Sequence, residues 1–379
     1  MANAVQQNSE PDLDVALGES YYEGSRALEE RYTNDIVEDT RRVIAAHFNE
    51  GRGPARRDAH AFDNGCVRAI FQVDENLPDD LCQGVFVRGR QYRAWIRFSN
   101  GNSERRPGWM FDARGMAIKL TGVPGEKLMD DEKHTQDFVL INQPRFFVDD
   151  LKRYRKTLEA FMRGGWFDQY VVALSKLRIP DELYLALKVN LNFMYNPLYQ
   201  QYWSMTPYRF GVDPEKKFAV KYTAKPRLHS KAGLLSRQLA RLGWNFSLKE
   251  EMNRTLAGNE VWFDFYIQRF VDETRTPIEN SKKMWREADS KPERVGTIII
   301  PIQDCMSPEQ AVFCENLSFS PWHSLPEHRP LGLVNRVRKV AYREISKLRH
   351  DLNRAPRQEP TGDETFDAHL TDAGSVADR

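Results

Sequence analysis

Short apolar runs, several of them alternating with polar residues, fall in two separate parts of the chain. The runs cover residues 66–73, 93–99, 115–120 and 137–142 in the first part, and 207–211, 217–223, 259–269 and 295–301 in the second. Such runs, bounded by turn-forming residues, are typical of β-strands. The pattern therefore predicts at least eight strands.

Between and around these runs, apolar residues recur at helical spacing. The predicted helices cover residues 24–47, 151–161, 168–177, 181–191, 232–242, 280–287, 308–313 and 331–352. Strands interrupted by helices on one core favour an α+β fold, an antiparallel barrel with helices packed outside it. We expect a flexible arm over 1–23, a single domain over 24–352, and a disordered tail over 353–379, which is rich in Pro, Asp and Thr.

Composition narrows the class of protein. The chain has 379 residues, 41% of them hydrophobic, which is enough for a large core. Its net charge of +1 gives no general attraction to nucleic acid or to anionic membranes. No apolar stretch predicts a transmembrane segment or a secretory signal. The cysteines form no Cys-x-x-Cys pair, which argues against a zinc site and fits a reducing cytoplasm: Cys66, Cys82, Cys305 and Cys314.

The 331–352 helix carries an unusual tyrosine. Arg338, Tyr342 and Arg349 are spaced i, i+4 and i+11 and therefore share one helical face. Neighbouring guanidiniums favour a phenolate, and a phenolate can ligate ferric iron. The simpler interpretation is a tyrosine packed on its own helix beside two solvated arginines, and spacing alone favours it.

Five sequence blocks in a fixed order favour the interpretation of Tyr342 as an iron ligand instead. They are Arg57-Asp-Ala-His60-Ala-Phe-Asp-Asn-Gly65, Arg97-Phe-Ser99, Asp112-Ala-Arg114-Gly115, Asn142-Gln-Pro-Arg-Phe-Phe147 and Arg338-Lys-Val-Ala-Tyr342. No block is specific alone, but their order resembles the core of the haem catalases, and the chain is most similar to the shorter catalase-related haem proteins. The resemblance covers about residues 57–349 and is weakest over 154–290. It implies an eight-stranded antiparallel barrel whose haem pocket is closed by the tyrosine-bearing helix.

The resemblance also implies roles at the iron. Tyr342 would be the axial ligand of a ferric haem b, held as phenolate by Arg338. His60 would be the distal base that moves the peroxide proton, with Ser99 ordering its ring. Asn142 would hydrogen-bond the peroxide, although it stands one residue closer to the following proline than the functional asparagine of catalases. A turn shorter by one residue would restore its position.

Five further residues have implied places around the haem. Arg57, Arg97 and Arg349 would bind the two propionates, because arginine forks match carboxylates. Tyr154 would lie over the distal face and Phe319 on the proximal side. Taken alone, each arginine is more simply interpreted as a member of a surface ion pair. Each aromatic residue alone is more simply interpreted as part of the core.

Two departures from the catalase pattern keep the activity open. Ala59 is smaller than the usual residue before the distal histidine, and Ser346 stands where catalases have a histidine, which we expect to loosen the proximal side. One reading is a haem peroxidase or weak catalase acting on hydrogen peroxide or organic hydroperoxides. A second is a fatty-acid hydroperoxide isomerase or lyase of the allene oxide synthase kind. A third is a non-catalytic haem-binding protein.

The predicted helix over 24–47 bears on assembly. Its apolar stripe is narrow and has no obvious place inside a barrel, so it can gain more by packing on a neighbouring subunit. Catalase relatives exchange N-terminal arms in this way. We therefore expect a homo-dimer or homo-tetramer.

Overall fold

A closed antiparallel barrel forms the centre of the computed structural model, which describes residues 13–51, 53–57, 60–101, 113–146, 148–155, 196–227 and 247–366. Its strands in the described ranges are β1 Asp63–Val73, β2 Gln91–Asn100, β3 Arg114–Leu120, β4 Gln136–Ile141, β5 Tyr202–Trp203, β7 Phe218–Pro226, β8 Val261–Arg269 and β9 Glu293–Ile300. They pair in the order β5-β4-β3-β2-β1-β9-β8-β7, and β5 pairs with β7 to close the ring. The short β6, Tyr208–Phe210, pairs with β7 outside this ring. The predicted eight-stranded barrel is confirmed.

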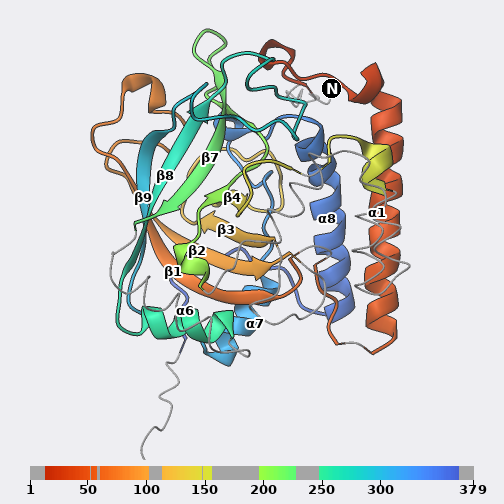
Figure 1. Ribbon diagram of the computed structural model, residues 1–379. Coiled ribbons are helices and arrows are strands. Elements are labelled where there is room, and N and C mark those ends of the chain that lie inside the picture. The colour runs from red at the N-terminus through yellow and green to blue at the C-terminus, as the bar shows by residue number, and fades with distance from the viewer. Residues whose placement is uncertain are drawn as a thin grey trace, which may run out of the picture.

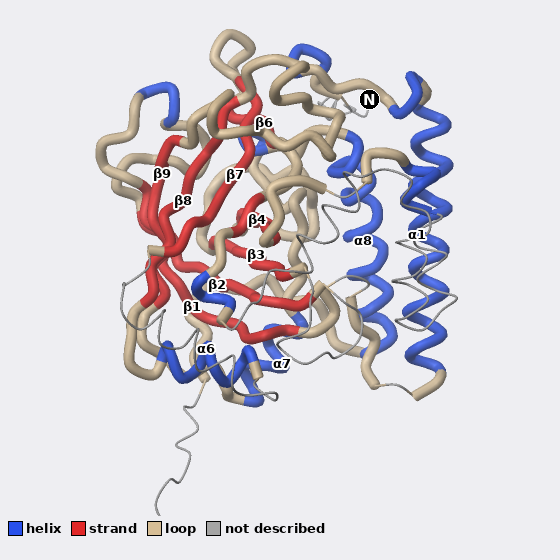
Figure 2. The backbone as a smooth tube through the Cα atoms, viewed as in Figure 1, coloured by secondary structure: helices blue, strands red, loops and turns tan. Residues whose placement is uncertain are grey.

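Helices pack around the barrel (Figures 1 and 2). The α-helices with both ends in the described ranges are α1 Arg26–Asn49, α6 Leu248–Leu256, α7 Pro308–Asn316 and α8 Leu333–Asn353. Serines cap three of them: Ser25, Ser247 and Ser307 each accept a backbone N–H of the first turn. Short 3-10 helices complete the list: η1 Val15–Leu17, η2 Tyr22–Gly24, η3 Asp79–Leu81, η4 Pro197–Tyr199 and η5 Pro326–His328.

The sequence patterns located most of these elements. The helices predicted over 24–47, 308–313 and 331–352 are present. The helix predicted over 280–287 is wrong, because this segment forms turns, with the Asn280 side chain accepting the Lys283 N–H at 3.1 Å. The segments 168–177, 181–191 and 232–242 lie outside the described residues, and of 151–161 only 151–155 is described, as helix.

The inside of the barrel is packed with aromatic side chains. Phe71, Phe138, Tyr222 and Phe265 are fully or almost fully buried, and their ring centroids lie 4.9–6.1 Å apart in successive pairs. Side chains alternate along a strand, so the neighbours of inward-facing residues point outward. A functional site formed by residues of the barrel strands must therefore lie on the outer face of the barrel.

Helix α8 lies beside the barrel, and α1 packs against α8 (Figure 1). Ile44 and Ile345 share one apolar cluster of the two helices, and Ile36 and Val337 share another. The apolar stripe of α1 thus has a place on its own chain, which removes the argument that it needs a neighbouring subunit. The homo-oligomer stays a prediction without that support.

Both expected tails are partly packed. Within the predicted arm, the carboxylate of Glu19 is buried and accepts from Arg329 at 2.6 Å. Within the predicted tail, Glu364 accepts from the indole of Trp95 at 2.9 Å, and Phe366 packs on the same ring. Residues 13–23 and 353–366 therefore lie on the folded domain, contrary to the expected flexibility, while 1–12 and 367–379 lie outside the described residues.

Candidate functional site

His60 stands at the end of the loop before β1, held against the outer face of the barrel. Its Nδ1 lies 3.0 Å from the Ser99 hydroxyl, and its backbone N–H donates to Gly101 at 3.2 Å. Directly beneath the ring is Gly115: a Cβ there would lie 2.7 Å from His60 Nδ1 and 2.6 Å from Ser99 Oγ. Only glycine fits, so three of the sequence blocks meet at one imidazole.

The surroundings of His60 keep it neutral. Burial, and then the positive charges of Arg97, Arg338 and Arg114, lower the pKa of its imidazole to about 3. Since Ser99 engages Nδ1, the other ring nitrogen, Nε2, is the one available to a ligand. A neutral imidazole with one free nitrogen can accept a proton and return it.

The three arginines predicted to bind propionates do come together. They converge on the carboxylate of Glu315, with closest distances of 3.0 Å for Arg57, 4.0 Å for Arg97 and 3.9 Å for Arg349. Arg57 and Arg349 also donate to the backbone carbonyls of Glu315 and Leu317, at the carboxyl end of α7. Burial opposes ionisation of Glu315, yet the arginine charges outweigh it and lower the pKa of the carboxyl.

This group of arginines is not neutralised by its own acid. Among the described residues, Glu315 is the one carboxylate that forms ion pairs with these three guanidiniums, in a place where Arg97 is almost fully buried. Burial, and then the charge of Arg57, lowers the pKa of Arg97, and the same two causes lower that of Arg349 to about 9. Arg97 Nε is buried with no hydrogen-bond partner among the described residues. A dianionic ligand would supply what the group lacks.

Helix α8 brings Arg338 and Tyr342 to the other side of the site. The Arg338 guanidinium lies 5.6 Å from the centre of the Tyr342 ring, and its Nη1 is buried with no partner in the described part of the chain. Ser346, one turn further on, is 2.7 Å from the hydroxyl of Ser318, which also lies 3.1 Å from His350 Nε2. Hydrogen bonds therefore link α8 to the loop that follows α7, and the looser proximal side expected from Ser346 stays a prediction.

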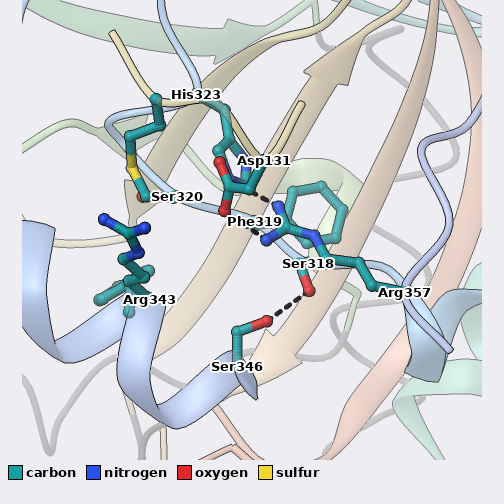
Figure 3. Close-up of a pocket in the computed structure, with 10 residues that line it drawn as sticks. Asp131, Ser318, Phe319, Ser320, His323, Arg343, Ser346 and Arg357 are labelled. Carbon is teal, nitrogen blue, oxygen red and sulfur yellow. Dashed lines mark hydrogen bonds and ion pairs between the residues drawn. The ribbon is translucent and has the colours of Figure 1, made fainter. Parts of the chain in front are cut away.

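A small polar pocket opens beside Tyr342 (Figure 3). Its lining comes from α8, from the loop at 318–323, and from the segments around 130 and 357: Met129, Asp131, Ser318, Phe319, Ser320, His323, Tyr342, Arg343, Ser346 and Arg357. Phe319, predicted on the proximal side, thus lies in the same pocket as Tyr342. The structure brings these two predicted residues together.

Behind Phe319 lies a buried charge network that the sequence blocks did not indicate. Lys119 Nζ is fully buried, 2.8 Å from an Asp137 oxygen and hydrogen-bonded to Glu132, and it lies 5.4 Å from the Phe319 ring. His323 Nδ1 is 2.9 Å from the Asp137 carboxylate. Glu132, Asp137 and His323 are close enough to hold a metal ion, but the lysine ammonium already lies against both acids. We therefore assign this network to structure.

Two predicted residues lie differently from what their proposed roles require. The amide oxygen of Asn142 accepts the backbone N–H of Arg114 at 2.8 Å, so it closes the β3–β4 ladder. Tyr154 packs with Tyr22, Leu151 and Leu333 near the start of α8, and its ring is 6.5 Å from that of Phe146. Contact of either residue with a haem or a peroxide stays a prediction.

The wall between His60 and α8 suits a flat apolar group. Ala117 and Val139 face each other on β3 and β4, on the same outer face as Gly115, and both are only half-buried among buried neighbours. These two side chains are apolar. Together with the nitrogens of Arg97 and Arg338 that have no hydrogen-bond partner among the described residues, they are compatible with a haem, which is an apolar macrocycle with two carboxylates.

Comparison with solved structures decides the fold. A fungal catalase matches with a TM-score of 0.64 and 19% identity, covering 88% of this chain and 68% of the other. Catalase A from Saccharomyces cerevisiae matches with a TM-score of 0.64 and 17% identity, covering 88% and 70%. The chain has the catalase fold. A bacterial catalase also shares this fold, with a TM-score of 0.61, 18% identity and coverage of 87% and 67%.

These matches show the fold and no more, because the identities are low. No protein-family model and no curated protein sequence matches the chain. Among the described helices, none has both the length and the apolar character that crossing a membrane requires. The catalase fold thus rests on backbone geometry, and the chemistry must be argued from the residues above.

Proposed function

We propose that the protein binds a b-type haem between the His60 wall and α8 and cleaves the O–O bond of hydroperoxides. The observation that carries this is the pairing of a neutral His60, fixed by Ser99, with three arginines that share one carboxylate, that of Glu315, among the described residues. A structural network would balance its own charges, whereas a ligand-binding site leaves this to the ligand.

The residues divide into two sets toward such a haem. Arg57, Arg97 and Arg349 would hold the propionates, with Glu315 fixing the arginines in place. Tyr342 would ligate the iron through its phenol oxygen, with the Arg338 guanidinium 5.6 Å from the centre of its ring. A ferric haem supplies a Lewis-acidic metal and the redox capacity for two-electron cleavage of a peroxide bond.

His60 moves the proton. Its Nε2 takes the proton of the hydroperoxide O–H and returns it to the oxygen that leaves, so the leaving group departs neutral. Ser99 keeps the ring in one orientation through Nδ1 and acts as a positioning residue. With a phenolic reductant the balance is one hydroperoxide and two phenols to one alcohol, one water and two phenoxyl radicals.

A haem-loading experiment tests the proposal. Protein expressed with ample haem should carry about one ferric haem per chain, visible as a Soret band with charge-transfer bands, and Tyr342→Phe should change that spectrum or lower occupancy. His60→Ala should keep the haem and slow peroxide cleavage by about a hundred- to ten-thousand-fold. A colourless wild type, or a His60→Ala variant within a few-fold of wild type, would contradict the proposal.

The products separate the catalytic readings. A peroxidase needs an added reductant and yields the alcohol. A fatty-acid hydroperoxide isomerase or lyase needs none and yields a rearranged or cleaved lipid. Mass spectrometry of a fatty-acid hydroperoxide reaction, with and without a phenol, distinguishes the two.

A further inference from the structure

The register of three strands identifies the side chain that accompanies His60. Ser99 on β2 is directly opposite Gly115 on β3, and Gly115 is directly opposite Ile141 on β4. Directly opposed residues of neighbouring strands place their side chains on the same face of a sheet. The Cβ direction of Gly115 runs into Ser99 Oγ and His60 Nδ1, so this is the face that carries the imidazole.

Ile141 therefore lies on the His60 face, one strand beyond the glycine. Opposed Cβ positions are about 5 Å apart, and the strand between contributes no side chain. An isoleucine is long enough to span that gap to the edge of the imidazole ring. Its own exposure of 9% agrees with a side chain facing a narrow space.

Asn142, the next residue, is engaged elsewhere. Its side-chain amide oxygen accepts the backbone N–H of Arg114 at 2.8 Å, and its backbone N–H donates to the backbone carbonyl of Arg114 at 2.9 Å. Both contacts hold the end of β4 to β3. The side-chain amide oxygen of Asn142 is thus already used on backbone, and the side chain that β4 places on the His60 face at this point is a hydrocarbon, that of Ile141.

We propose that Ile141 makes this a site for organic hydroperoxides in preference to hydrogen peroxide, an inference that rests on the proposed function. Hydrogen peroxide is polar at both ends and benefits from a second hydrogen-bonding group beside the imidazole. An organic hydroperoxide has one hydroxyl, which His60 serves, and a carbon group that an apolar wall accommodates without leaving a polar atom unpaired.

The substitution Ile141→Asn tests this selectivity, with Ile141→Val as the apolar control. In haem-loaded protein, the ratio of kcat/KM for cumene hydroperoxide to that for hydrogen peroxide should fall about tenfold in Ile141→Asn, as expected for one added hydrogen bond and a lost apolar contact. Ile141→Val should keep the wild-type preference. A ratio unchanged in Ile141→Asn at full haem occupancy would overturn the proposal.

Ligand binding gives a readout apart from turnover. A new amide donor should tighten cyanide binding to the ferric haem by about three- to tenfold in Ile141→Asn, measured by Soret titration, and Ile141→Val should not change it. Equal cyanide affinities in all three proteins would count against a side chain at 141 that faces the ligand.

The placement of Ile141 can also be tested without haem. In haem-free protein with labelled isoleucine methyls, Ile141 should give a nuclear Overhauser contact to the His60 ring, identified by its loss in Ile141→Val. Absence of that contact overturns the inference whatever the protein binds. A colourless wild type that keeps the contact refutes the proposed function and, with it, the substrate preference, but leaves the position of Ile141 established.

Discussion

Two histidines contact the same outer face of the barrel in opposite electrostatic surroundings. Around His323 the acids Asp131, Glu132 and Asp137 are paired with the cations Lys119 and Arg357, and all three acids also contact the imidazole. Around His60 the near charges are arginines, with Glu315 the one acid that pairs with them among the described residues. The first group pairs its acids with cations, and we call it the balanced network; in the second, the arginines outnumber the acid among the described residues, which favours an anionic ligand.

The pKa values of the two histidines shift in opposite directions because of this difference in surrounding charge. Although burial and Lys119 oppose it, the surrounding carboxylates raise the pKa of His323, whereas burial and the arginines lower that of His60 to about 3. A balanced network is expected to contribute to stability, and an unbalanced one to binding. The predictions below test that division.

Breaking the balanced network should have the largest effect. Lys119→Met leaves Glu132 and Asp137 buried without their cation and should lower the free energy of unfolding by about 3–5 kcal/mol. Urea unfolding of haem-free protein measures this. The matched control is Arg26→Met, which removes the exposed Arg26–Glu30 pair, each side chain 59% exposed, and should cost less than about 1 kcal/mol. Similar losses in the two variants would show that the network adds nothing.

Removing a charge from the arginine group should affect haem affinity more than stability. Arg97→Met removes one of several crowded positive charges, so haem-free stability should fall by no more than about 1 kcal/mol. Haem affinity should fall about ten- to a hundred-fold, because a charge-assisted hydrogen bond to a propionate is worth about 1.5–3 kcal/mol. Haem dimethyl ester, which lacks the propionate charges, should bind wild type and variant alike. A large stability loss with unchanged haem affinity would assign Arg97 to structure.

The sequence predicted the parts of this site that are carried by compact blocks. The apolar runs predicted seven of the eight barrel strands; β5 was not predicted, and the run at 207–211 forms β6 outside the ring. The order of the blocks placed His60 and Ser99 together, as the structure has them. The blocks also singled out Asn142, whose contact with a peroxide stays a prediction. Strand register is set by cross-strand pairing, and one residue of register moves a side chain to the opposite face, so only the β2–β3–β4 alignment identifies Ile141.

The sequence could not predict other contacts, because these contacts join segments that are far apart in the chain. Lys119 and Asp137 are opposed on β3 and β4, but His323 arrives from a loop almost two hundred residues later. Glu315 carries no sequence signal among many exposed glutamates until the fold gathers three arginines around it. The composition of the tail beyond residue 353 predicted disorder, yet the ring of Phe366 packs against that of Trp95 on the barrel. Such pairings depend on tertiary packing.

The pH dependence of stability should separate the two histidines. Because the folded pKa of His60 is lowered to about 3, the unfolded state binds a proton below about pH 6.5 that the folded state does not, so stability falls as the pH drops toward 4. His60→Gln should reduce that slope by about 1 kcal/mol per pH unit. His323, with a raised pKa, contributes stability below about pH 6.5 that is lost as the pH rises through its folded pKa.

Unfolding curves at a series of pH values test both signs. His323→Gln should therefore cost most in mildly acidic solution and less in alkaline solution. A His60→Gln variant with the wild-type slope between pH 4 and 6 would mean that His60 is protonated in the folded protein. It would then be unfit as a base.

The smallest expected effect is at the hydrogen-bonded chain that ties α8 to the loop carrying Phe319. Ser346→Ala removes the 2.7 Å contact with Ser318, but Ser318 keeps His350 Nε2 at 3.1 Å, so no buried hydroxyl is left alone. The loss should be about 0.5–1.5 kcal/mol, a shift of a few degrees at most in Tm. Ser318→Ala removes both contacts and should cost more, because it leaves the buried ring nitrogen of His350 with one partner fewer. If Ser346→Ala proves as harmful as Ser318→Ala, the two serines act as one unit, and the helix that carries Tyr342 depends on Ser346 directly.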